Sequence, residues 1–386
     1  MKRIDHRDRS PVAAGATVVI ALAMLVVGCD TTPQTGPEAA PPTVSQAKPS
    51  TASIVLSGSG MGVDVPAPPP GFRLTWKDDF NGPAGKRLSP GKWIYDIGTS
   101  YGCVGCPDQW GTFEIETMTD RTDNVSLDGE GNLLITPIRD LDGNWTSGRI
   151  ETRKADFTAG EDGILRVEAA IQQPQTGFGP EATGYWTAFW MLGAPFRGVF
   201  LNWPGIGEID IMESINGRPA SFAVLHCGVN PGGPCNESSG IGRERADATL
   251  QDGFHVYAME LDKSVQPNQL RFYVDDDNFF TIFSTQVPAE TWRNATDHGF
   301  FVILNVAIGG AFPWAECTFF PHPDGCNTPG APFPRVDTSN SASGMPMKVA
   351  YVAVYNSMKQ RGYTTALLDS APSLMARAKV GRLTSA

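Results

Sequence analysis

The chain has 386 residues, of which 41% are hydrophobic, so it can bury a sizeable core as one large domain or two small ones. Its formal net charge is −11 at pH 7, which argues against nucleic acid or another polyanion as the ligand because like charges repel. A neutral polysaccharide is compatible with this charge.

The first 28 residues have the pattern of a secretory signal peptide. A basic stretch leads into an apolar run from Val12 to Val27, which is short for a membrane span. The run ends in Val-Val-Gly before Cys29, an arrangement that resembles a bacterial lipobox whose cysteine is lipidated. An ordinary signal peptide with an incidental cysteine is the alternative. We expect an exported protein, either anchored to a membrane through Cys29 or secreted.

The remainder divides into three parts by composition. Residues 29–70 are rich in Pro, Ala, Ser and Thr and predict a flexible linker. Residues 71–357 contain short alternating runs separated by Gly, Pro, Asn and Asp, with no long helical period. This texture predicts an all-β sandwich or barrel. Residues 358–386 form a tail, either a short surface helix or disordered, for which the sequence suggests no function.

Six cysteines follow Cys29 and fall into three close pairs. In an exported chain these pairs favour local disulfides, although six thiols allow fifteen connectivities. Zinc is a poor alternative for the first pair, because no second pair has its spacing. The expected bonds are Cys103–Cys106, Cys227–Cys235 and Cys317–Cys326.

Three acidic residues lie close together in residues 205–217. Glu208 and Asp210 would share one face of an extended strand, because side chains alternate. Glu213 would fall on the opposite face unless the strand carries one extra residue, and we expect that β-bulge at Met212. The bulge would place all three carboxylates on one wall.

Crowded carboxylates raise one another's pKa, which a fold has little structural reason to accept. Cleavage of a glycosidic bond does need one ionised carboxylate and one protonated carboxylic acid. A half-exposed strand with an acidic polar face is the alternative. Aromatic residues in nearby or similarly patterned stretches favour a sugar site, since they can serve as platforms for sugar rings: Tyr185, Trp186, Trp190, Trp203, Phe312 and Trp314.

The segment Glu208-Ile-Asp-Ile-Met-Glu213 resembles the active-site motif of family 16 glycoside hydrolases, in the bulged form typical of laminarinases, which are endo-1,3-β-glucanases. The resemblance implies a jelly-roll β-sandwich of the concanavalin A-like type with a cleft on its concave sheet. It covers nearly all of residues 70–356, through six further stretches: 76–82, 147–153, 184–193, 255–260, 304–310 and 351–355.

The resemblance also implies roles for the acids. Glu208 would be the nucleophile and Glu213 the general acid/base of a retaining mechanism. Asp210 would hydrogen-bond Glu208 and keep the two glutamate pKa values apart, with a purely structural carboxylate as the alternative. Catalysis would need no cofactor.

Six further residues are candidates for substrate binding. A tryptophan at a sugar subsite, an arginine that reaches the cleft and a histidine near the acid/base are implied by the resemblance. Core packing of one of the two is the alternative for Trp186 and Trp190, a surface salt bridge for Arg149 and a structural role for His226. The candidates are Trp203, Trp186, Trp190, Arg149, His226 and Asn305.

Members of the family often bind a structural calcium on the convex face. One ligand would come from Asp79, but the second position is Ala350, which has no carboxylate. We therefore expect that calcium site to be weakened or absent.

The expected activity is endo-cleavage of 1,3-β-glucan, with mixed-linkage 1,3-1,4-β-glucan as a further substrate, by a monomer. One alternative is a galactanase or agarase of the same family. Another is a transglycosylase or a carbohydrate-binding protein of the cell envelope. The intact Glu208 and Glu213 argue against a pure binding protein, which needs no acid/base pair.

Overall fold

The computed structural model describes residues 64–319 and 336–358, with only the backbone of residues 317–319. The predicted signal peptide, Cys29, most of the linker, the Cys317–Cys326 pair and nearly all of the tail lie outside the described part. Within it, no helix is long and apolar enough to cross a membrane.

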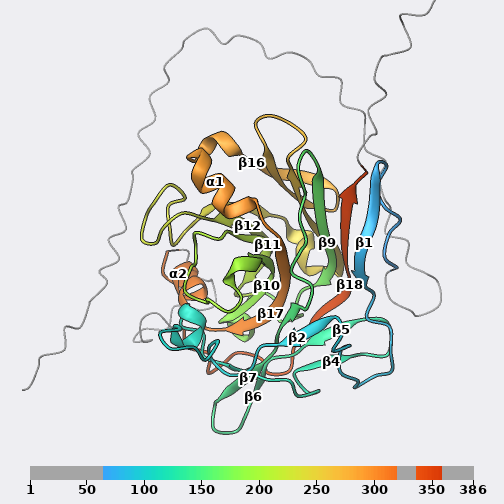
Figure 1. Cartoon of the computed structure of the whole chain (residues 1–386). Helices are drawn as coiled ribbons and strands as arrows, with labels where there is room; N and C mark the ends of the chain where they lie inside the picture. Colours follow the sequence, from blue (N-terminus) through green and yellow to red (C-terminus); the bar gives the residue numbers. More distant parts are fainter. Residues whose placement is uncertain (1–63, 320–335, 359–386) are drawn as a thin grey trace, which may run out of the picture. The chain divides into compact units, whose positions relative to one another are not determined.

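One antiparallel sheet has eight strands, in the order β16-β15-β14-β9-β18-β5-β4, with β1 also paired to β18 (Figure 1). Its strands read as alternating runs in the sequence, as a sheet with one face in the core requires. They are β1 (Phe72–Asp78), β4 (Val125–Leu127), β5 (Leu133–Ile135), β9 (Ile164–Gln172), β14 (Phe254–Asp262), β15 (Gln269–Val274), β16 (Asp277–Phe283) and β18 (Met347–Ser357).

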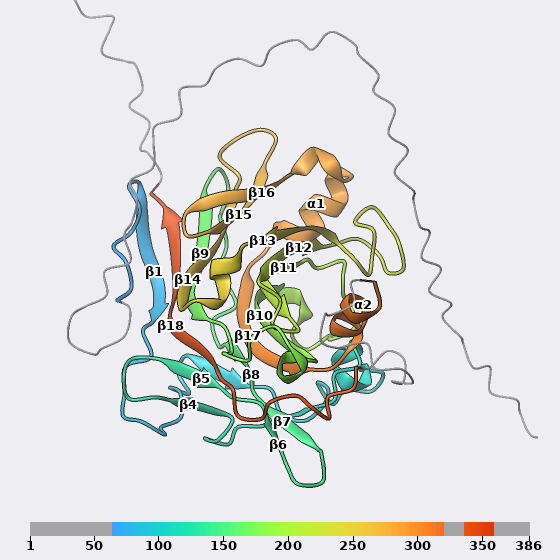
Figure 2. The same ribbon diagram turned by 180° about the vertical axis from the view of Figure 1, so that it is seen from behind.

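A second antiparallel sheet has seven strands, in the order β13-β12-β11-β10-β17-β8-β2 (Figure 2). They are β2 (Trp93–Tyr95), β8 (Arg149–Thr152), β10 (Tyr185–Gly193), β11 (Glu208–Ile215), β12 (Ala220–His226), β13 (Ile241–Ala246) and β17 (Phe300–Ile308). A small third sheet joins β3 (Thr117–Met118), β7 (Trp145–Ser147) and β6 (Ile138–Arg139). Two short helices that the sequence pattern did not predict are α1 (Ala289–Thr296) and α2 (Ala311–Phe319).

The main core lies between the two large sheets. Phe189, Ile209 and Leu304 from the seven-stranded sheet share one buried cluster with Met259 and Phe272 from the eight-stranded sheet, and none of the five is exposed. Burying one such side chain stabilises the fold by about 1.5–3 kcal/mol. The predicted all-β sandwich is confirmed.

A second buried cluster lies on the other face of the seven-stranded sheet. Trp190 and Ile303 belong to it, and Tyr101, Phe200 and Trp203 from the loops pack against it. Loop residues therefore cover part of this outer face.

The predicted bulge is present in β11. Opposite β10, Met212 pairs with Phe189 and Asp210 with Trp190, so the residue without a partner is Ile211 rather than the predicted Met212. Opposite β12, Ile211 and Met212 together face a single residue. Both side chains lie in the main core, which accommodates the extra residue.

Candidate active site

A cleft opens on the outer face of the seven-stranded sheet. Glu208, Asp210 and Glu213 of β11 all line it, as the bulge requires. Two other strands of the same sheet supply Arg149 from β8 and Asn305 from β17. The other lining side chains are mostly aromatic and include Tyr101, Trp110, Trp186, Trp190, Phe196, Phe200 and Trp203. All the predicted substrate-binding residues except His226 line this cleft, and His226 contacts two of its acids.

The three acids have different neighbours. Trp186 Nε1 donates a 2.8 Å hydrogen bond to Glu213 Oε1. His226 Nε2 lies 3.3 Å from Asp210 Oδ2 and 4.0 Å from Glu208 Oε1. Glu213 is thus held by an indole, whereas Glu208 and Asp210 face an imidazole.

Burial raises the pKa of Glu208 to about 8, and the charge of Asp210 adds to the rise. The charges of His226 and Arg149 oppose it, because a nearby cation favours the ionised form. Burial also raises the pKa of Glu213 well above its usual value, again with a contribution from Asp210. The hydrogen bond from Trp186 and the charge of His226 oppose that rise.

Three carboxylates in one buried site cannot all ionise cheaply, so the cleft retains a proton near neutral pH. Glu208 has two cations among its main neighbours and Glu213 has one. This asymmetry favours the proton on Glu213, which suits a general acid, and the negative charge on Glu208, which suits a nucleophile.

Trp203 lies beside the imidazole of His226. The ring centroids of Trp203 and His226 are 5.6 Å apart and tilted by 46°. Trp203 is half-buried and lines the cleft, so the sequence-based placement of this aromatic side chain next to the acids agrees with the geometry.

Arg149 does not form the surface salt bridge considered as an alternative. It is buried, its Nε donates to Asp96 at 3.1 Å, and its Nη2 donates to the Tyr101 hydroxyl at 2.6 Å. Its guanidinium also lies 4.4 Å from the ring centroid of Trp110 and 4.8 Å from that of Trp190. Tyr101 and Trp110 were missed in the sequence, since the loop that carries them has no strand pattern.

Trp190 and Asn305 hold each other across two neighbouring strands. Trp190 Nε1 donates to Asn305 Oδ1 at 2.7 Å, and both residues are buried. The hydrogen bond fixes the plane of the Trp190 indole beneath Arg149. Trp190 is therefore part of the second buried cluster as well as of the cleft wall.

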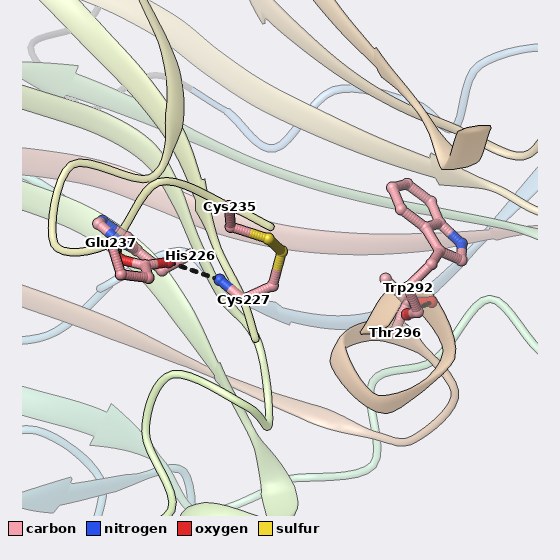
Figure 3. The surroundings of a disulfide bond; sticks show 6 residues. All are labelled: His226, Cys227, Cys235, Glu237, Trp292 and Thr296. Carbon is pink, nitrogen blue, oxygen red and sulfur yellow. Dashed lines mark hydrogen bonds and ion pairs between the residues drawn. A yellow bond between two sulfur atoms is a disulfide. The ribbon is translucent and has the colours of Figure 1, made fainter. Parts of the chain in front are cut away.

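The structure contains the predicted disulfides Cys103–Cys106 and Cys227–Cys235. The second begins directly after His226, and Figure 3 shows His226 and Glu237 on one side of it and Trp292 of α1 on the other. Glu237 was missed as a site residue, although it follows the second cysteine of the bond by only two positions.

The positions implied for calcium do not fit a cation. The Asp79 carboxylate pairs with Lys77 Nζ at 2.9 Å, and Ala350 is buried without any side-chain oxygen. In the described part of the chain, one group of three or more His, Cys, Asp or Glu residues has potential metal-ligand atoms within 4.8 Å of one another. It consists of Glu208, Asp210 and His226. His226 Nδ1 already lies 2.7 Å from Glu237 Oε2, and the raised pKa of His226 favours the protonated ring, which has no lone pair to offer a metal.

Replacing Trp186 with phenylalanine is expected to move the alkaline limb of the kcat/KM profile to higher pH, by about one unit. The indole hydrogen bond favours ionised Glu213 and so lowers its pKa. Without it the pKa rises further, and Glu213 keeps its proton to higher pH. The profile should be measured from pH 4 to 10 on the β-glucans that the sequence resemblance implies. An alkaline limb that stays in place or moves down would show that Glu213 is not the group that must be protonated.

The chain is similar to known proteins over most of its length. A family model described as an XgeA-like, catalytic GH16 domain matches residues 177–259, which include all three acids. The beta-glucanase of Rhodothermus marinus is 30% identical over 272 residues, covering 67% of this chain and 84% of the relative. The glucan endo-1,3-beta-glucosidase A1 of Niallia circulans is also 30% identical, over 74% of this chain, but this chain spans only 38% of that relative's length.

Solved structures agree with the sandwich. The endo-1,3-beta-glucanase of Streptomyces sioyaensis has 51% identity and a TM-score of 0.69, covering 76% of this chain and 99% of its own. The laminarinase of Rhodothermus marinus has 28% identity and a TM-score of 0.53 over 74% of this chain and 97% of its own. These similarities confirm the predicted jelly-roll type.

Proposed function

This chain belongs to glycoside hydrolase family 16, and on that premise we propose that it cleaves 1,3-β-glucan internally with retention of anomeric configuration. The chain is a glycoside hydrolase of all-β fold. The observation that carries the finer proposal is the shared cleft, in which Glu208 and Glu213 lie on one wall among aromatic side chains.

The first half of the proposed reaction uses both glutamates. The ionised Glu208 attacks the anomeric carbon and forms a glycosyl-enzyme ester. Glu213 gives its proton to the glycosidic oxygen as that bond breaks, which releases the chain on the reducing-end side. The pKa of Glu213, raised by burial, keeps this proton available near neutral pH.

The second half reverses these roles. Glu213, now ionised, takes a proton from water as the water oxygen attacks the anomeric carbon. The bond to Glu208 breaks, its carboxylate is restored, and the product keeps the β configuration. Asp210 lies between the glutamates, and its charge raises the pKa of both.

Aromatic side chains supply the expected sugar platforms. Trp203 lies beside the acids, and Tyr101, Trp110 and Trp190 surround Arg149 in the same cleft. A neutral glucan fits these walls, because sugar rings stack on aromatic faces and their hydroxyls accept from a buried guanidinium. Mixed-linkage 1,3-1,4-β-glucan is included in the proposal as a second substrate.

Activity on laminarin, curdlan, lichenan and agarose tests this proposal. We expect oligosaccharide release from the 1,3-β-glucans, weaker release from lichenan, and none from agarose. Proton NMR of fresh laminarin product should show the β anomer first. Cleavage of agarose alone would show that the substrate is a galactan. Release of the α anomer first would show that the mechanism is inverting.

We further propose that the protein is exported and held at a membrane by a lipid on Cys29. The pattern of residues 1–28 supports this, as do the two disulfides, which persist in oxidising compartments. Replacing Cys29 with alanine is expected to move the protein from the detergent phase to the aqueous phase. Unchanged partitioning of Cys29→Ala, with wild-type protein as the reference, would contradict the anchor.

A further inference from the structure

Glu237 is a buried carboxylate that does not line the cleft. Its side chain is 0% exposed, and its Oε2 lies 2.7 Å from His226 Nδ1. Its Oε1 accepts a 2.8 Å hydrogen bond from the backbone N–H of Cys227 (Figure 3). Its own backbone pairs in both directions with Gly232, at 2.6 Å each way.

The Cys227–Cys235 disulfide makes this arrangement rigid. It closes the loop from Cys227, directly after His226, to Cys235, two residues before Glu237. Both cysteines are fully buried in the main core cluster, with Trp292 of α1 in the same cluster. The position of the Glu237 carboxylate is therefore fixed relative to the imidazole.

The other ring nitrogen faces the acids of β11. His226 Nε2 lies 3.3 Å from Asp210 Oδ2 and 4.0 Å from Glu208 Oε1. An imidazole with a carboxylate at each nitrogen satisfies both only when both nitrogens carry protons. We propose that Glu237 is a positioning residue that holds His226 as an imidazolium, with its Nε2–H directed at Asp210, as the counter-charge of the nucleophile Glu208. This inference rests on the proposed function.

The charged groups around His226 set the direction of the effect. They are Glu208, Asp210 and Glu213 on β11 and Glu237 in the loop, while Arg149 on β8 acts on Glu208. Burial alone would lower the pKa of His226, but the Asp210 and Glu237 carboxylates, which lie against its two ring nitrogens, raise that pKa well above the usual value.

The imidazolium in turn lowers the pKa of Glu208, against burial and Asp210. The distant charge of Glu237 raises that pKa, but by less than His226 lowers it. The ion pair of His226 and Glu237 therefore favours ionised Glu208. With Glu237 in place, the nucleophile is available at lower pH.

The substitution Glu237→Gln removes the negative charge of the side chain and keeps its shape. The amide oxygen of glutamine can accept from Cys227 N–H, which leaves its NH₂ group facing His226 Nδ1. Nδ1 must then accept, so His226 becomes neutral with its proton on Nε2. The number of hydrogen bonds is kept and the positive charge beside Glu208 is lost.

We expect the acid limb of kcat/KM on laminarin to move to higher pH in Glu237→Gln, by about one unit. Glu208 then needs a higher pH to ionise, so kcat/KM below the limb falls about tenfold. Near the alkaline limb, kcat/KM of the variant and of the wild type should become equal. The matched control is Glu244→Gln on β13, which removes a half-buried glutamate paired with Arg218 outside the cleft and should leave the acid limb unchanged.

A readout without turnover is the ¹⁵N spectrum of the histidine rings, with His226 assigned from His226→Gln. In the wild type, His226 should be doubly protonated beyond neutral pH, and in Glu237→Gln it should be the neutral Nε2–H form. An unchanged His226 titration, or a parallel drop in activity with a lower melting temperature and an unmoved acid limb, would overturn the proposal. If the wild type cleaves no glucan, the proposed function fails, while the ¹⁵N titration still decides the Glu237–His226 pair.

Discussion

Replacing Glu213 with glutamine is expected to lower kcat on laminarin by about 10²- to 10⁴-fold, the usual contribution of a positioned general acid/base. The amide cannot give a proton to the glycosidic oxygen, nor take one from water. It can still accept the hydrogen bond from Trp186 Nε1, so the wall of the cleft should keep its shape. The rate should be measured together with the melting temperature.

Stability provides the control for that variant. The pKa of Glu213 is higher in the folded state than in the unfolded chain. The free energy of unfolding therefore falls as the pH rises above the unfolded-state pKa of this group. Glutamine has no such loss, and Glu213→Gln should be at least as stable as the wild type at pH 7. Near-normal turnover of Glu213→Gln would show that another residue protonates the leaving group.

Replacing Glu208 with glutamine is expected to abolish the glycosyl-enzyme and lower kcat by at least about 10³-fold. A substrate with an activated aryl leaving group should not restore kcat of this variant, because the variant lacks the nucleophile and departure of the leaving group is not the limiting step. The same substrate should partly restore Glu213→Gln in its first step. This difference assigns the two roles without reference to any relative.

Alanine at either position makes the assignment stricter, since it leaves room for azide. In Glu208→Ala, azide attacks the anomeric carbon as Glu213 protonates the departing oxygen, and the product is the α-glycosyl azide. In Glu213→Ala, azide displaces the Glu208 carboxylate from the glycosyl-enzyme, which gives the β-glycosyl azide. The reverse pair of products would exchange the two roles, and NMR of the anomeric proton distinguishes them.

The sequence predicted the sandwich and the acidic wall because both depend on local alternation. Glu208 and Asp210 are two positions apart, and any strand places them on one face. The position of Glu213 predicted that the strand carries a bulge, but it did not predict which residue is the extra one. Ile211 and Met212 are both apolar and both fit the core, so only pairing with β10 and β12 decides which residue lacks a partner.

The surroundings of the acids could not be predicted in the same way. Arg149, Tyr101 and Trp110 come together from one strand and one irregular loop, and no local period encodes that meeting. Glu237 reaches His226 because a disulfide bends the chain back on itself. The helix α1 is only eight residues long, too short for a helical pattern to stand out among strands.

The acids lie on a strand with hydrogen-bonded neighbours on both sides, whereas most of the aromatic side chains that line the cleft lie outside the strands. Chemistry and recognition are thus carried by separable parts of the polypeptide. Grafting a different set of rim segments onto this scaffold could retune which polymer is cut while the cutting machinery stays where it is. Diversification of such enzymes can proceed at the periphery, at little risk to the reaction.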